Sequence, residues 1–133
     1  MTEQLSPLTL QALAVVKESG AIIGANHAHP HTIRHKGRID LVTETDIAVE
    51  AFLKERLATL APQAGFLAEE SAEDLSLPDT CWIIDPVDGT TNFAHGLPLT
   101  VTSVAYRLNG EIVLGIVNAP LLHECFIAEK GKG

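Results

Sequence analysis

Apolar residues recur at helical spacing near the start of the chain. Ser6 followed by Pro7 is a helix-start signal, because Ser is a favoured N-cap and Pro fits the first helical position. The apolar positions that follow are Leu10, Leu13, Ala14, Val16, Ala21, Ile22 and Ile23. This pattern predicts one long helix to about Ala25. The next segment, from Asn26 to Arg38, is polar and predicted to be irregular.

A second helix is predicted where apolar residues again repeat every three or four positions. Its buried stripe would consist of Val49, Phe52, Leu53, Leu57 and Leu60. Thr43 or Thr45 is a suitable N-cap, and Pro62 is expected to end the helix. Asp46 would then lie in the first turn. A carboxylate there is stabilised by the helix dipole, so on local grounds both a structural and a functional role remain open for Asp46.

Short apolar or alternating runs in the rest of the chain predict strands. These runs are Gly65–Ser71, Cys81–Ile84, Leu99–Leu108, Glu111–Val117 and Cys125–Ile127. Asn109 followed by Gly110 is a strong signal for a two-residue hairpin, and Asn118–Pro120 predicts another turn. We therefore expect an α+β fold in which two long helices pack against a largely antiparallel sheet.

Composition narrows the class of protein. The 133 residues fit one domain, and 46% hydrophobic residues are enough for a core. The net charge is −8 and the nine Lys and Arg residues are scattered, which argues against a nucleic-acid groove. We see no basic, apolar leader and no apolar run near the roughly 18 residues of a membrane span, so we expect a cytoplasmic protein without a membrane partner. Cys81 and Cys125 are expected to be buried free thiols.

A histidine-rich segment offers one candidate metal site. It contains His27, His29, His31 and His35. Three histidines at alternate positions would share one face of an extended strand and could bind zinc or copper. A solvated loop is the favoured interpretation, because Pro30 breaks the stretch and no Cys or acidic residue accompanies it.

The stretch from Cys81 to Gly96 carries the strongest chemical signal. An apolar strand is followed by Asp85 and Asp88, with Pro86 stiffening a turn between them. Gly89 is conformationally permissive, and Thr90, Thr91 and Asn92 are suitable caps for a helix that starts there. Carboxylates suit a hard cation such as Mg²⁺, and free N–H groups at a helix start suit a phosphate. Together they predict metal-assisted hydrolysis of a phosphate ester.

Other interpretations of this acidic turn fit less well. An EF-hand needs acids at alternate positions, whereas Asp85 and Asp88 are three apart. A P-loop needs a Lys that Gly89–Thr91 lacks. Haloacid-dehalogenase phosphatases place their second Asp two residues after the first, whereas Asp88 comes three residues after Asp85. The remaining alternative is a turn without function, which the other acids in the chain disfavour.

The residues Trp82–Pro98 closely resemble the signature of the inositol monophosphatase family. Asp40–Asp46 and Ala68–Ser71 are similar to its two upstream motifs, in the same order, although Ala68 stands where the family usually has Gly. The signature looks more like that of inositol monophosphatases than that of the related bisphosphatases. The resemblance implies a Mg²⁺-dependent phosphomonoesterase with a layered α/β sandwich, acting on a small phosphorylated polyol such as inositol 1-phosphate.

The resemblance also implies roles for particular residues. Glu69, Asp85 and the backbone carbonyl of Val87 would hold one Mg²⁺, and Asp85 and Asp88 a second. Asp46 and the Thr90 hydroxyl would orient and deprotonate the attacking water, with Glu69 also counted as catalytic. The residues implied to contact substrate or phosphate are Glu69, Asp88, Gly89, Thr90 and Thr91. Lys36 resembles a basic residue of the family's metal-site loop.

The chain is short for a member of this family. Members of this family are roughly twice as long, so residues 1–133 are expected to form the amino-terminal half of such a phosphatase domain. One alternative is a non-catalytic module that binds Mg²⁺ weakly or docks onto a partner. Another is a related phosphatase acting on histidinol phosphate or a nucleotide phosphate. A homodimer is also compatible, since the family often dimerises.

Overall fold

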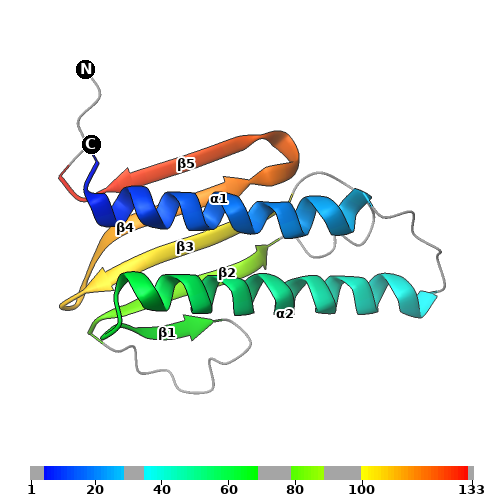
Figure 1. The fold of residues 1–133 in the computed structure, drawn as a ribbon, viewed down its shortest axis with the longest axis horizontal. Helices are drawn as coiled ribbons and strands as arrows, with labels where there is room; N and C mark the ends of the chain where they lie inside the picture. The colour runs from blue at the N-terminus through cyan, green and yellow to red at the C-terminus, as the bar shows by residue number, and fades with distance from the viewer. Residues whose placement is uncertain (1–4, 29–34, 69–78, 89–99, 132–133) are drawn as a thin grey trace.

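The computed structural model describes residues 5–28, 35–68, 79–88 and 100–131, without the side chains of 26–28, 35–43 and 68. In chain order the elements are α1 (Pro7–Ala28), α2 (His35–Leu60), β1 (Gly65–Ala68), β2 (Cys81–Asp88), β3 (Val101–Leu108), β4 (Glu111–Ala119), the short 3₁₀ helix η2 (Pro120–Leu122) and β5 (Glu124–Glu129). Figure 1 shows the two long helices side by side across one face of the sheet.

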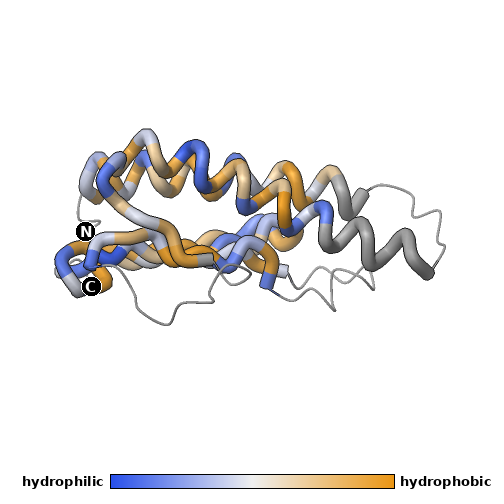
Figure 2. The backbone as a smooth tube through the Cα atoms, turned by 90° about the horizontal axis from the view of Figure 1, so that it is seen from below, coloured by the Kyte–Doolittle hydropathy of each residue, from blue (hydrophilic) through white to orange (hydrophobic). Residues whose placement is uncertain are grey.

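The five strands form one sheet in the order β1-β2-β3-β4-β5. β1 pairs with β2 in parallel, and the other neighbours pair antiparallel, which confirms the largely antiparallel sheet expected from the sequence. Asn109 and Gly110 have φ angles of 51° and 84°, as a hairpin turn with two left-handed residues requires. Seen along the sheet plane in Figure 2, the helices and the sheet form two layers. This arrangement is a partial α+β sandwich.

α1 begins where the sequence predicts. The Thr9 amide N–H donates to Ser6 Oγ over 3.2 Å, and the Leu10 N–H donates to the Ser6 carbonyl over 3.0 Å, so Ser6 is the N-cap. The same end is tied to β5, because the Ser6 N–H and the Thr9 hydroxyl both donate to Glu129 Oε1. The helix continues to Ala28, three residues beyond the predicted end.

α2 begins earlier than predicted. It starts at His35, so neither Thr43 nor Thr45 caps it, and Asp46 lies well inside the helix rather than in its first turn. Thr45 is fully buried at its interior position. The error arises because Thr is only a weak helix breaker, and packing overrides its preference for a cap. The interpretation of 26–38 as irregular is accordingly wrong at both ends.

A further boundary correction concerns the end of β4. We expected a turn at Asn118–Pro120, but β4 continues through Ala119 and η2 follows. The reversal is completed by His123, whose φ is 56°. Proline at the start of η2 explains the shift, because it fits the first position of a short helix.

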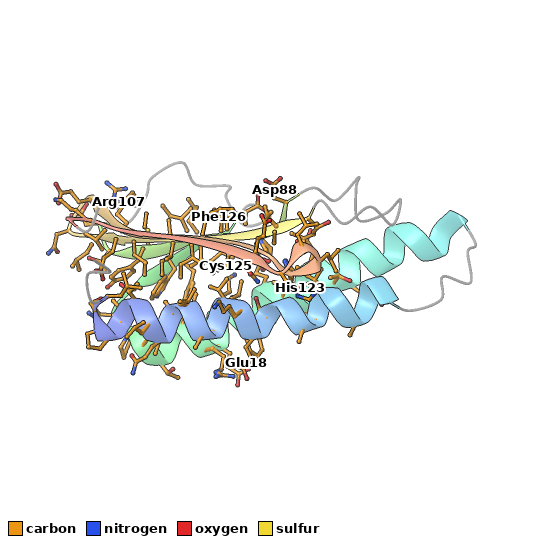
Figure 3. The ribbon with its side chains drawn as sticks, turned by 90° about the horizontal axis from the view of Figure 1, so that it is seen from above. Glu18, Asp88, Arg107, His123, Cys125 and Phe126 are labelled. Carbon is orange, nitrogen blue, oxygen red and sulfur yellow. The ribbon has the colours of Figure 1, made fainter. Side chains whose placement is uncertain are left out.

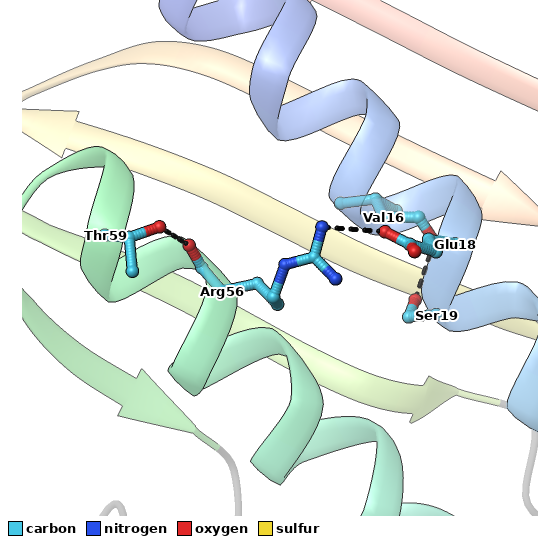
Figure 4. Close-up of polar contacts among 5 residues, drawn as sticks. All are labelled: Val16, Glu18, Ser19, Arg56 and Thr59. Atoms are coloured by element: carbon cyan, nitrogen blue, oxygen red, sulfur yellow. Dashed lines mark hydrogen bonds and ion pairs between the residues drawn. The ribbon is translucent and has the colours of Figure 1, made fainter.

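The core lies between the helices and the sheet. Trp82 on β2 and Tyr106 on β3 stack with ring centroids 4.4 Å apart, and Trp82 is fully buried. The helices contribute Ala12, Val15, Val16, Ile23, Val49, Leu53 and Leu57. On the outer side of the helix pair, Arg56 of α2 forms an ion pair with Glu18 of α1 at 2.9 Å (Figure 4). Both side chains are exposed, so this pair adds little to stability.

α1 also meets one criterion of a membrane-spanning helix. Its segment Pro7–Ala25 is long and apolar enough to cross a membrane, by length and composition alone. The expectation that no segment reaches this length is therefore wrong, because the average hydropathy stays high despite Lys17 and Glu18. A core helix passes the same test, and α1 buries Ala12 and Val16 in the core.

Candidate metal centre

A β-bulge in β2 decides where its two carboxylates point. Asp85 pairs with Ser103 and Asp88 with Val101, so three steps along β2 match two along β3. In a regular strand, residues three apart face opposite sides, but one extra residue brings Asp85 and Asp88 to the same side. Figure 3 shows Asp88 on the side of the sheet away from the helices. The predicted turn between the acids is therefore wrong, because β2 stays extended through both.

A buried hydrogen bond holds the bulge in shape. Thr102 of β3 is fully buried, and its hydroxyl donates to the Pro86 carbonyl oxygen over 2.9 Å. Pro86 has no N–H to give to the sheet, so a bulge is one of the few places where a strand tolerates it. Val87 is 3% exposed, which anchors the extra residue in the core. Thr102 was not predicted from the sequence, although a proline inside an apolar run is a signal for a bulge.

Asp46 approaches the sheet from the helix layer. It is half-buried on α2, directly after the fully buried Thr45, and α2 packs against β2. One carboxylate oxygen of Asp46 and one of Asp85 are buried, whereas Asp88 is exposed. The structure therefore separates an inner carboxylate, Asp85, from an outer one, Asp88, on the same strand.

Several predicted site residues lie outside the described ranges. These are Glu69, Gly89, Thr90 and Thr91, together with the predicted helix start after Gly89. Lys36 lies in the first turn of α2, but its side chain is not described. Their roles remain predictions. β1 ends at Ala68, and Ala68 pairs with Ile84, next to Asp85. The backbone thus brings the residue before Glu69 to the strand that carries both aspartates.

The donor chemistry of this strand end fits a hard cation. Asp85 and Asp88 offer carboxylate oxygens and Val87 a backbone carbonyl, which are the ligand types that Mg²⁺ prefers. Among residues 5–28, 35–68, 79–88 and 100–131, no three His, Cys, Asp or Glu side chains form a metal-binding group. Asp46 is therefore not a third ligand beside Asp85 and Asp88 here, and any third carboxylate ligand would come from outside these residues.

The structure also tests the predictions made for the histidines and the cysteines. His27 lies in α1 and His35 in α2, so the extended strand on which the histidine site depended is wrong, while His29 and His31 fall outside the described residues. Cys81 and Cys125 are free thiols, as predicted, although Cys125 is only half-buried. Burial raises the pKa of both thiols. Arg107 partly offsets this rise at Cys81, and Lys17 partly offsets it at Cys125.

Comparison with known proteins relates this geometry to one family. Residues 4–133 match the model of the inositol monophosphatase family. The chain is 45% identical over 126 residues to an inositol monophosphatase of Dictyostelium discoideum, covering 92% of this chain and 46% of the relative. It is 34% identical over 132 residues to the Nus factor SuhB of Salmonella typhimurium, covering 97% and 49%.

A solved structure has a similar fold over most of this chain. The extragenic suppressor protein suhB of Bartonella henselae superposes with a TM-score of 0.77 at 32% identity, covering 95% of this chain and 48% of that one. The chain thus spans about half the length of the curated relatives it matches.

Proposed function

The chain belongs to the inositol monophosphatase family, and we propose that it contributes to the Mg²⁺ site of a phosphomonoesterase. The observation that carries the proposal is the bulge in β2, which turns Asp85 and Asp88 to one side of the sheet. Two carboxylates on one side of the sheet can bind a divalent cation. The bound cation would then attract an anionic substrate to a chain whose net charge is −8.

In the proposed mechanism, Glu69, Asp85 and the Val87 carbonyl would hold one Mg²⁺, and Asp85 and Asp88 would hold a second. Mg²⁺ bound there would acidify a water molecule and offset the charge of the phosphate. Asp46 and the Thr90 hydroxyl would orient that water, and the Asp46 carboxylate would accept its proton. The backbone N–H groups of Gly89 and Thr90 would hold the phosphate.

The proposed roles of Asp85 and Asp88 follow from their positions in the structure and from their chemistry. Asp85 has one buried carboxylate oxygen, and a bound cation would offset the cost of burying that charge. Asp88 is exposed and can reach a substrate hydroxyl as well as a cation. Because phosphoryl transfer needs positioning and charge neutralisation more than covalent help, no nucleophilic side chain is required.

The proposed substrate is a small phosphorylated polyol, with inositol 1-phosphate as the first candidate. The name of the Dictyostelium relative supports this choice. Histidinol phosphate and a nucleotide monophosphate are the alternatives within the same chemistry. Parallel assays with these three compounds would separate them, because each presents the same phosphate on a different alcohol.

A non-catalytic role is the second candidate. The Salmonella relative is named a Nus factor and not a phosphatase, and it is similar over 97% of this chain. One side of the sheet also carries exposed apolar residues, including Phe126 at 62% exposure. A module that docks through this side would not need a complete metal centre.

The test is phosphate release from inositol 1-phosphate by the purified chain, with and without Mg²⁺. Mg²⁺-dependent turnover that Asp85→Asn removes would support the proposal. Asp79→Asn is the matched control, because Asp79 is an exposed aspartate outside the centre, and it should leave turnover unchanged. A folded chain without turnover would mean that the chain is part of an enzyme or has the non-catalytic role, and equal turnover in Asp85→Asn would refute the assignment of the centre.

A further inference from the structure

A groove lies between α1 and the end of the sheet formed by β4, η2 and β5, on the helix side of the sheet. Its volume is about 650 Å³, which is within the usual range of small-molecule sites. It is separate from the candidate metal centre, because Asp88 lies on the other side of the sheet (Figure 3). The residues of the groove that matter here are Lys17, Gly20, Gly24, Asn118, Glu124 and Cys125.

The strand side of the groove is formed by two neighbouring side chains. Asn118 of β4 pairs with Cys125 of β5, so the two side chains lie next to each other on the same side of the sheet. Figure 3 shows Cys125 on the side of β5 that faces α1. Asn118 and Cys125 therefore both point toward the helix and into the groove between them.

The helix side of the groove is formed by residues three and four positions apart on α1. Lys17, Gly20 and Gly24 share one face of the helix at this spacing. A Cβ added at Gly20 would lie 3.0 Å from Asn118 Nδ2, so the amide of Asn118 lies directly against α1 at this point. A Cβ added at Gly24 would meet nothing within 4 Å, so the groove is open beside Gly24.

Asn118 is the residue that points to a ligand. It is 5% exposed, yet its side-chain amide forms no hydrogen bond with another described residue. An amide side chain has two N–H donors and one acceptor oxygen, and polar groups buried this deeply normally have partners. Because Asn118 lines the groove, a molecule bound there can supply those partners.

Two opposite charges accompany the buried amide. Lys17 and Glu124 both line the groove, and both are exposed. Neither forms an ion pair with a described residue, so they do not neutralise each other. The Lys17 ammonium partly offsets the rise in the pKa of the Cys125 thiol, which places its charge near the strand side of the groove. The groove thus offers one ligand a cation, a carboxylate and an amide.

We propose that this groove binds a small zwitterion of the amino-acid class, with one carboxylate and one ammonium group. The ligand carboxylate accepts hydrogen bonds from Lys17 and from the Asn118 amide, and the ligand ammonium group donates to Glu124. A phosphate dianion is disfavoured, because Glu124 and a chain with a net charge of −8 both repel it. A zwitterion has no net charge and avoids this repulsion. The inference does not depend on the proposed phosphatase activity.

NMR titration of the isotope-labelled chain in Mg²⁺-free buffer tests the proposal. The probes are glycine, β-alanine and γ-aminobutyrate, which separate the two charges by increasing distances. Each is compared with the acid of the same length that lacks the amine, namely acetate, propionate or butyrate, and inorganic phosphate is titrated as well. We expect at least one amino acid to shift the backbone amide signals of the groove residues, with a dissociation constant on the order of 1 mM. Its amine-free counterpart should bind at least about tenfold more weakly, since it cannot reach Glu124 with a charge.

Variants of the groove assign the contacts. Gly24→Leu puts a side chain into the open space and replaces Gly with a better helix former, so it should block binding while the chain stays folded. Asn118→Ala should weaken binding of the amino acid at least about tenfold, because it removes the amide. Lys17→Gln should weaken the amino acid and its amine-free counterpart alike. Glu124→Gln should remove only the advantage of the amino acid.

Lys54→Gln and Glu55→Gln are the matched controls, because both residues lie on α2 outside the groove, and they should leave binding unchanged. Circular dichroism establishes that each variant is folded. Absence of binding by all three amino acids would overturn the proposal. So would equal binding of the amine-free acids, tighter binding of inorganic phosphate, or binding that Gly24→Leu leaves unchanged.

Discussion

The Thr102 hydroxyl donates a 2.9 Å hydrogen bond to the Pro86 carbonyl oxygen, across the bulge that separates Asp85 from Asp88. Pro86 lies between the two aspartates, so this contact links a buried residue of β3 to the geometry of the candidate metal centre.

Thr102→Val keeps the size of the side chain but removes the donor. The Pro86 carbonyl would then be buried without this partner, so we expect a loss of about 1 to 3 kcal/mol in unfolding free energy. A looser bulge should also weaken Mg²⁺ binding. Urea denaturation and calorimetry measure the two effects.

Thr100→Val is the control for this change. Thr100 Oγ1 is buried and has no hydrogen-bond partner among the described residues, so its replacement should be neutral or stabilising. Equal losses in Thr100→Val and Thr102→Val would show that the hydrogen bond to Pro86 has no special role.

The contact between α1 and η2 predicts opposite effects for two glycines of one helix. A Cβ at Gly20 would lie 2.9 Å from Pro120 Cβ and 3.0 Å from Asn118 Nδ2, so Gly20→Ala forces Pro120 or the helix to move. We expect a loss of about 1 to 3 kcal/mol in unfolding free energy, less the helix-propensity gain of up to about 1 kcal/mol. Gly24→Ala meets nothing within 4 Å and should be stabilising. Thermal unfolding of both variants would reveal a mistake if Gly20→Ala were the more stable.

Cys81 predicts a dependence of stability on alkaline pH. Burial raises the pKa of its thiol in the folded chain, and Arg107 only partly offsets this. The unfolded thiol ionises first, from about pH 8.5, so stability should be constant below that pH and fall as the pH rises through the folded pKa. Cys81→Ala should make the fall between about pH 8 and 10 shallower. Identical pH profiles of melting temperature for the wild type and the variant would contradict this cause.

Local signals in the sequence were enough for much of the fold. Ser6–Pro7 predicts the start of α1 because capping depends on neighbouring residues, and Asn109–Gly110 predicts the β3–β4 hairpin for the same reason. The start of α2 was not predictable in this way. Thr45 is a good cap in isolation, but α2 begins at His35, so Thr45 lies inside the helix and is buried there.

The candidate centre was predictable in composition but not in geometry. The aspartates at 46, 85 and 88 and the carbonyl of Val87 stand out by residue type and by resemblance to the family. That Asp85 and Asp88 share one face follows from pairing between β2 and β3, which places an extra residue opposite Thr102. Pairing between strands is a non-local property, so spacing along the chain suggested a turn instead.

The most direct test of the central claim is calorimetric titration of Mg²⁺ into the purified wild type, Asp85→Asn and Asp79→Asn. If the β2 bulge forms a metal centre, the wild type and Asp79→Asn should bind Mg²⁺ with the same affinity, and Asp85→Asn should bind at least about 100-fold more weakly, since a charged ligand is lost. Equal binding by all three proteins, or no binding by the folded wild type, would contradict the assignment of Asp85 and Asp88 as metal ligands in this chain.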